Sequence, residues 1–211
     1  MRILVLGATG EIGSAVVETA LDAGHEVTAF ARSAAKLGRL GDRARAIAGD
    51  VTDAVAVATA VSGHDAVINA IGSSPDPAQL DLPATAMGNV MSGMERHGVR
   101  RLVGLAGGAV SLPGERKPLS GRLTSSLVRL MARNVVEAKQ RELNAVAASA
   151  LDWTMVRPPR VVDGPPTGRV VIGDKLHGFR VTRGDLAVAM LRLAAETSWL
   201  RQAPYVSERR S

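Results

Sequence analysis

The sequence predicts an α/β fold built around a doubly wound parallel sheet. Short apolar runs alternate with helical patterns from the first residues onward, and this alternation is typical of βαβ units, whose strands lie parallel. We expect six parallel strands, at residues 2–6, 26–30, 44–48, 66–69, 101–105 and 153–156. Helical patterns cover residues 11–23, 52–61 and 84–97, and a long helical region ends near Ala150.

Three glycines follow helical patterns directly, at Gly24, Gly63 and Gly98. Glycine readily takes the left-handed conformation that ends a helix. These positions therefore predict helix ends, and the histidines beside them are expected to be structural.

The pattern changes after Pro158. A loop rich in proline and glycine leads to a short strand at 169–172, a helix at 185–195 and a last strand near 203–206. With 211 residues and 46% apolar content, the chain can bury one sizeable core. We expect residues 1–211 to form one domain, with a core at 1–157 and a small lobe on the substrate side at 158–211.

Composition excludes several kinds of site. The chain has no cysteine, so disulfides, thiolate metal sites and thiol nucleophiles are excluded, and no metal site is predicted. No run of about 18 apolar residues occurs, and we expect a cytoplasmic protein that has no signal peptide and does not bind membranes.

A basic stretch lies between Glu95 and Glu142, with ten basic and four acidic residues and no aromatic residue. Nucleic-acid readers usually combine basic residues with stacking aromatics. We therefore expect a solvated helix face or a partner surface here, and no nucleic-acid partner.

The segment Gly7-Ala8-Thr9-Gly10-Glu11-Ile12-Gly13 follows the first strand and opens the first helix. Glycines at these places allow a tight turn, a close approach of pyrophosphate to the backbone and close packing of the helix. The segment predicts the phosphate-binding turn of a Rossmann-type dinucleotide site. Its expected cofactor-binding residues are Gly7, Thr9, Gly10, Glu11, Ile12 and Gly13.

The residue after the second strand discriminates between the two nicotinamide cofactors. An acidic residue there accepts a hydrogen bond from the ribose 2′-hydroxyl of NAD, whereas an arginine pairs with the 2′-phosphate of NADP. The residue is Arg32, which favours NADP(H) over NAD, and Lys36 could add a second positive charge.

Two further strand ends are expected to contact the cofactor. Asp50 and Val51 close the third strand and could lie against the edge of the adenine ring. Asp50 could instead be a helix-entry residue ahead of Thr52. After the fourth strand come small residues that would let a ribose approach. We expect Ala70, Ile71 and Gly72 to contact the cofactor at this ribose.

Seven stretches carry a resemblance that extends over nearly the whole chain: 7–13, 23–32, 49–57, 63–72, 97–103, 149–159 and 178–191. The chain resembles the atypical short-chain dehydrogenases/reductases with an NAD(P)H-binding domain, and most closely the biliverdin reductase B, or NADPH-dependent flavin reductase, group. The resemblance implies that Arg32 binds the 2′-phosphate and that the backbone of Pro158 and Pro159 lies beside the nicotinamide. It also implies a planar small-molecule substrate.

The chain departs from typical short-chain dehydrogenases in two places. Their catalytic tyrosine stands four residues before a lysine, but Val135 precedes Lys139 at that spacing, and the usual serine or threonine after the fifth strand is replaced by Ala106-Gly107-Gly108. The remaining candidates for catalysis are Lys139, His177 and Ser111. Ser73 and Ser74 are expected to be loop residues, and Arg157 either binds an acidic substrate or fastens its loop.

These observations favour an NADPH-dependent oxidoreductase that transfers hydride to a planar acceptor such as a flavin, quinone or tetrapyrrole. The missing hydroxyls also suit a non-catalytic NADP(H)-sensing regulatory protein related to the nitrogen-metabolite repressors. A sugar-nucleotide epimerase or dehydratase is a second alternative, although those enzymes need the missing tyrosine. The sequence leaves open a monomer or a homodimer.

Overall fold

A six-stranded parallel sheet forms the centre of the computed structural model, which describes residues 1–72, 76–112, 115 and 133–209. The strand order is β3-β2-β1-β4-β5-β6, the order of doubly wound dinucleotide-binding sheets. The strands are β1 (Arg2–Leu6), β2 (Glu26–Ala31), β3 (Arg45–Ala48), β4 (Ala66–Asn69), β5 (Arg101–Leu105) and β6 (Asp152–Val156). The predicted fold class and the six parallel strands are confirmed.

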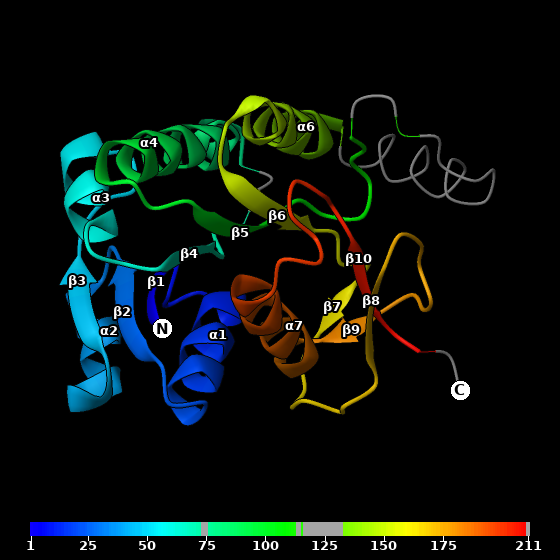
Figure 1. Ribbon diagram of the computed structural model, residues 1–211, viewed down its shortest axis with the longest axis horizontal. Coiled ribbons are helices and arrows are strands. Elements are labelled where there is room, and N and C mark those ends of the chain that lie inside the picture. Colours follow the sequence, from blue (N-terminus) through cyan, green and yellow to red (C-terminus); the bar gives the residue numbers. More distant parts are fainter. Residues whose placement is uncertain (73–75, 113–114, 116–132, 210–211) are drawn as a thin grey trace.

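Helices cover both faces of the sheet (Figure 1). One face carries α3 (Ala54–Val61), α4 (Leu82–His97) and α6 (Arg133–Ala148), and the other carries α1 (Glu11–Asp22) and α7 (Arg183–Ala195). In β1, Ile3 and Val5 pack toward α1 and α7, whereas Leu4 and Leu6 pack toward α3 and α4. Burial on both faces is why residues 3–6 of this strand are all apolar.

Local capping explains where the observed boundaries differ from the expected ones. The helix expected from residue 52 begins at Ala54, because the Asp53 carboxylate accepts hydrogen bonds from the amides of Val55 and Ala56 at 2.9 and 3.1 Å. The short α2 (Ala34–Leu37) and the 3₁₀ helices Gly38–Arg43 and Pro77–Gln79 were not expected. Most of the segment before α6 lies outside the described residues.

The three glycines expected to end helices all have positive φ, at 79° for Gly24, 78° for Gly63 and 67° for Gly98. Only glycine adopts such angles without strain. This part of the sequence prediction is confirmed.

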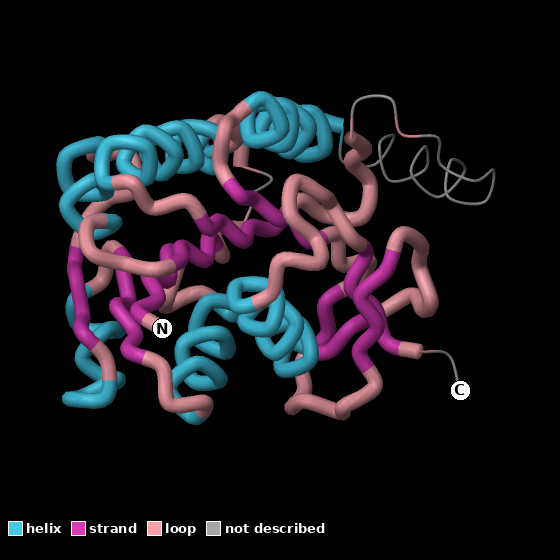
Figure 2. Tube along the Cα trace, viewed as in Figure 1, coloured by secondary structure: helices cyan, strands magenta, loops and turns pink. Residues whose placement is uncertain are grey.

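The chain after β6 forms two small sheets beside the main one (Figure 2). Strands β7 (Val161–Val162) and β9 (Val181–Thr182) pair in parallel, and β8 (Val170–Gly173) pairs antiparallel with β10 (Tyr205–Glu208). The last strand begins two residues later than expected, because the carbonyls of Ala203 and Pro204 instead accept hydrogen bonds from Arg157.

The buried Asp185 ties α7 to the loop before β8. Its carboxylate accepts from the amides of Thr167 and Gly168 at 2.9 and 3.1 Å and from the Thr167 hydroxyl. These bonds fix the start of α7, which packs against α1. The C-terminal strands are thereby held next to the carboxyl end of the main sheet.

Over the described ranges, no helix is long and apolar enough to cross a membrane. The same residues contain no group of three or more histidine, aspartate or glutamate side chains that could hold a metal ion.

We predict that Gly13→Ala destabilises the protein. The added methyl group would collide with the Gly7 carbonyl, lying 2.7 Å from its carbon atom, and overpacking of this kind costs about 3 kcal/mol of unfolding free energy. Chemical denaturation measures the change. The control is Gly88→Ala in α4, where no atom lies within 4 Å of the added group and the helix gains about 0.5–1 kcal/mol. Equal stability of the two variants would contradict the packing described here.

Candidate active site

The glycine turn lies where β1, α1 and β4 meet. Gly7 has φ 74°, and a side chain there would lie 3.1 Å from the backbone carbon of Ala70. The amide of Gly10 donates to the Gly7 carbonyl at 2.9 Å, and the amide of Ser14 donates to the Gly10 carbonyl at 2.9 Å. Close backbone approaches therefore require the glycines that the sequence singled out.

The first turn of α1 presents free backbone donors. Gly10 precedes the helix in an extended conformation and gives no side-chain cap, and no described residue accepts from the amides of Glu11, Ile12 or Gly13. Such amides, together with the helix dipole, form a site for a phosphate group. The Glu11 side chain turns to solvent, with its carboxylate 3.4 Å from Arg183.

Arg32 is exposed at the end of β2, and its guanidinium makes no hydrogen bond or ion pair within the described part of the chain. It lies near Asp50, which follows β3. Hydrogen bonds from the amide and hydroxyl of Thr52, both 2.8 Å, lower the pKa of Asp50, and the charge of Arg32 adds to the effect. Asp50 therefore orders the turn before α3, while Asp53 caps that helix. Arg32 remains available to an anion.

The ends of β3 and β4 are also held by side-chain amides. The Val51 carbonyl accepts from Asn89 Nδ2 at 2.9 Å, and the amide of Ile71 donates to Asn69 Oδ1 at 3.2 Å. Val51 and Ala70 are buried, whereas Ile71 and Gly72 line a cavity beside the glycine turn.

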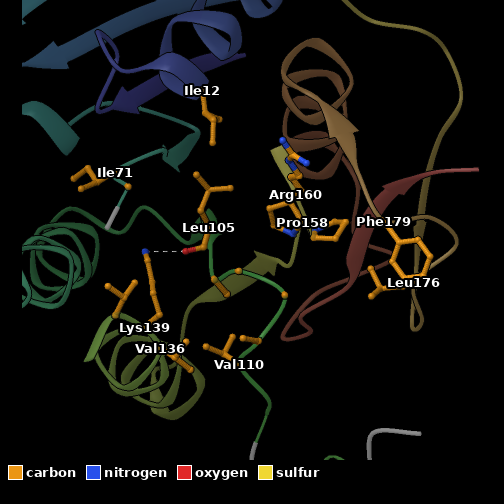
Figure 3. A pocket seen from close by; sticks show the side chains of 17 residues that line it. Ile12, Ile71, Leu105, Val110, Val136, Lys139, Pro158, Arg160, Leu176 and Phe179 are labelled. Atoms are coloured by element: carbon orange, nitrogen blue, oxygen red, sulfur yellow. Dashed lines mark hydrogen bonds between the residues drawn. The ribbon is translucent and has the colours of Figure 1, made fainter. Parts of the chain in front are cut away.

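This cavity, of about 490 Å³, lies at the carboxyl ends of β1, β4, β5 and β6 (Figure 3). Seventeen described residues line it, and all but Lys139 and Arg160 are aliphatic, aromatic, glycine or proline. The lining includes Lys139, a candidate for catalysis, and five of the residues predicted to bind the cofactor. These five are Ile12, Ile71, Gly72, Pro158 and Pro159.

The two departures noted in the sequence face this cavity. Val135 occupies the wall one helical turn before Lys139, and Gly107 and Gly108 form the wall after β5. A side chain at Gly108 would lie 3.2 Å from the Pro158 carbonyl. Methyl groups and backbone thus stand where a typical short-chain dehydrogenase has hydroxyls.

Lys139 reaches the cavity wall but is committed to protein groups. Its ammonium donates to the Leu105 carbonyl at 3.0 Å and lies 2.7 Å from Glu142 Oε2 (Figure 3 shows the bond to Leu105). The Glu142 side chain is 1% exposed. Burial raises the pKa of Glu142, and the ammonium of Lys139 opposes that shift. Lys139 is therefore half of a buried ion pair on α6.

Arg157 fastens the loop after β5 through contacts within the protein. Its guanidinium is buried, lies 2.8 and 2.7 Å from the two carboxylate oxygens of Glu115, and stacks 4.1 Å from the centre of the Tyr205 ring. Burial raises the pKa of Tyr205. Of the two interpretations of Arg157, the structure shows the second.

Ser111 and His177 lie outside the cavity lining. Both backbone polar groups of Ser111 are bonded to Gln140, at 3.0 and 2.7 Å. The His177 amide donates to Ser207 Oγ at 3.1 Å, and its ring lies near Gly173. Ser73 and Ser74 fall outside the described residues.

Among the lining residues that were not anticipated from sequence, three lie in the chain after β6: Arg160, Leu176 and Phe179. They come from loops after β6 and between β8 and β9. The apolar residues Leu176 and Phe179 are 36% and 64% exposed. The signal that identifies Leu176 and Phe179 is an exposed large apolar side chain beside a cavity, and this signal requires the position of the loop in the structure.

Comparisons with known proteins agree with this geometry. A family described as NAD(P)H-binding matches residues 7–197. YwnB of Bacillus subtilis is 25% identical over 201 residues, which cover 90% of this chain and 91% of that protein. A 3-beta-hydroxysteroid dehydrogenase of Mycolicibacterium neoaurum is 31% identical over 125 residues, 54% of this chain. The chain covers only 34% of the length of that dehydrogenase.

Solved structures share the fold over the full length. A Lactobacillus casei protein superposes with a TM-score of 0.84, 25% identity and complete coverage of both chains. ChuY, an anaerobilin reductase of Escherichia coli O157:H7, has a TM-score of 0.79 and 23% identity over 99% of this chain and 97% of its own.

The glycine turn, the strand order and the match over residues 7–197 lead to one conclusion. The chain belongs to the family of NAD(P)H-binding Rossmann domains.

Proposed function

We propose that the protein is an NADPH-dependent reductase of planar, largely apolar acceptors such as flavins, quinones or tetrapyrroles, as in the biliverdin reductase B group. One observation carries the proposal. The cavity next to the glycine turn is lined by apolar side chains, glycine and proline, with two cations as the exceptions. Its volume of about 490 Å³ lies within the range of small-molecule sites.

The cavity walls suit a flat ring system. Pro158 lies on one side, Val136 of α6 lies on another, and Phe179 stands at the rim (Figure 3). The adjacent residues Pro159 and Val135 also line the cavity. Flat apolar rings gain from burial against such surfaces. A polyhydroxylated sugar would leave its hydroxyls without partners here, which costs free energy and argues against the epimerase or dehydratase alternative.

The wall chemistry also favours direct reduction over ketone chemistry. Among the described lining residues, no side chain carries a hydroxyl, imidazole or carboxyl group, and the ammonium of Lys139 is held by Leu105 and Glu142. Reduction of a conjugated acceptor depends mainly on placement of the two rings, and solvent can supply the proton. The protein's task is therefore to position the acceptor ring against the nicotinamide.

The residues around the turn fit NADPH. Free amides at Glu11, Ile12 and Gly13 suit the diphosphate, and the uncommitted Arg32 suits the 2′-phosphate. When bound, NADPH supplies the hydride. The backbone at Pro158 and Pro159 would bound the nicotinamide end, where the apolar cavity lies.

ChuY, which shares this fold, is described as an anaerobilin reductase, and this supports a reductase. The absence of a hydroxyl from the described lining also favours a second candidate, an NADP(H)-sensing regulatory protein without catalysis. The two differ in whether bound NADPH is oxidised.

The test is titration of the purified protein with NADPH and NADH by calorimetry. Absorbance assays with flavin mononucleotide, a quinone and biliverdin follow on the same preparation. Tight NADPH binding with turnover of an acceptor supports the reductase. Tight binding without any turnover would overturn it in favour of the sensor.

We predict that Arg32→Gln weakens NADPH binding about 10-fold, since a charge-assisted bond to the 2′-phosphate is lost. NADH binding should change by less than about twofold, because NADH lacks this phosphate. Calorimetric titration of the variant with each cofactor measures both. The control is Arg96→Gln, at the far end of α4, which should leave both affinities unchanged. Equal losses for NADPH and NADH in Arg32→Gln would refute the role of Arg32.

We also predict that Lys139 is held in a stabilising pair. Lys139→Met leaves Glu142 buried without its counter-ion and should cost about 3–5 kcal/mol of unfolding free energy. The double variant Lys139→Met/Glu142→Leu should recover most of this loss. Arg133→Met, which breaks the exposed pair with Glu137 on the same helix, should have no measurable effect. Chemical denaturation compares all three, and failure of the double variant to recover stability would contradict the pairing.

A further inference from the structure

Arg160 is the one cation in the described cavity lining that has no protein partner. Its side chain is exposed and makes no hydrogen bond or ion pair with any described residue. Only its backbone carbonyl is engaged, by the amide of Val181 at 2.9 Å. Figure 3 shows Arg160 beside Pro158, across the cavity from Lys139.

The neighbouring charged side chains already have partners among themselves. Lys139 is paired with Glu142 and Arg157 with Glu115. The two carboxylates nearest in sequence to the cavity residues Ile12 and Arg160, those of Glu11 and Asp163, both pair with Arg183, at 3.4 and 3.3 Å. Among the described lining residues, Arg160 is therefore the charged group that these pairs leave unengaged at the apolar cavity.

We propose that Arg160 binds an anionic group, a carboxylate, phosphate or sulfonate, carried by the planar acceptor. This inference rests on the proposed function and narrows its substrate class to planar acids. A guanidinium beside an apolar cavity favours a ligand whose ring is buried and whose charge lies at the rim.

The other possible source of this anion is the cofactor diphosphate. The diphosphate already has donors in the free amides of the α1 first turn. Arg160 instead follows the Pro158-Pro159 wall and shares the cavity with Leu176 and Phe179. This placement favours the acceptor.

The experiment compares acceptors that differ only in an anionic group: flavin mononucleotide with riboflavin, naphthoquinone sulfonate with naphthoquinone, and biliverdin with its dimethyl ester. Calorimetry first measures binding of each to the protein loaded with NADP⁺, where no turnover occurs. NADPH oxidation then gives kcat/KM for each acceptor. The variants are Arg160→Gln and Arg160→Glu.

The matched control is Lys175→Gln. Lys175 is an exposed cation next to Leu176 that does not itself line the cavity. Its removal changes the net charge by the same amount as Arg160→Gln. This control therefore distinguishes a direct contact between Arg160 and the anionic group from a general effect of positive charge near the cavity.

The wild-type protein is expected to bind the anionic member of at least one pair about 10-fold more tightly. Arg160→Gln abolishes this preference, Arg160→Glu reverses it, and Lys175→Gln preserves it. A preference that survives in Arg160→Gln would overturn the inference. A second result would also overturn it: Arg160→Gln weakens NADPH binding and lowers kcat/KM equally for all acceptors. Arg160 would then bind the cofactor and not the acceptor.

The outcomes also separate this inference from the proposed function. Selective binding of anionic acceptors without turnover would reject the reductase and retain the Arg160 site. Turnover of acceptors without regard to charge would retain the reductase and reject the Arg160 site.

Discussion

The close packing of three backbone segments, the end of β1, the first turn of α1 and the end of β4, is the constraint on which the rest of the site depends. Gly13 packs on the Gly7 carbonyl, and Gly7 packs on Ala70. Because no side chains separate these segments, the free amides of α1 lie beside the cavity at the carboxyl ends of the strands. The strand order turns at this point, between β1 and β4, where parallel sheets bind their ligands.

Electrostatics then divides the basic residues of the site into two groups. Lys139, Arg157 and Arg183 are committed to Glu142, Glu115 and the pair Glu11 and Asp163. Lys139 also joins α6 to the Leu105 carbonyl at the end of β5, and Arg157 holds the loop after β5. Arg32 and Arg160 lack such partners within the described structure, and our proposals assign ligand recognition to them.

The sequence predicted the parts of the site that depend on local chemistry. The glycine turn, Arg32 at the end of β2 and the replacement of tyrosine by Val135 all follow from short-range patterns. Their positions within the fold are as expected, because the carboxyl ends of parallel strands share one edge.

The loops that complete the cavity could not be placed in the same way. Leu176 and Phe179 reach it through the long-range pairings β8–β10 and β7–β9, which leave no periodic signal in the sequence. Arg157 was ambiguous because its burial depends on Glu115 and Tyr205, both distant in sequence. Glu142 could have been noticed, since residues three apart on a helix are neighbours.

The central claim is that the apolar cavity brings a planar acceptor to the nicotinamide of NADPH, and an isotope experiment tests it most directly. Under anaerobic conditions, NADPH carrying deuterium at its transferable position is mixed with the protein and each planar acceptor. The account predicts oxidation of NADPH that is slower with deuterium, because the protein positions a direct hydride transfer. Tight binding of NADPH with no oxidation by any acceptor would contradict it.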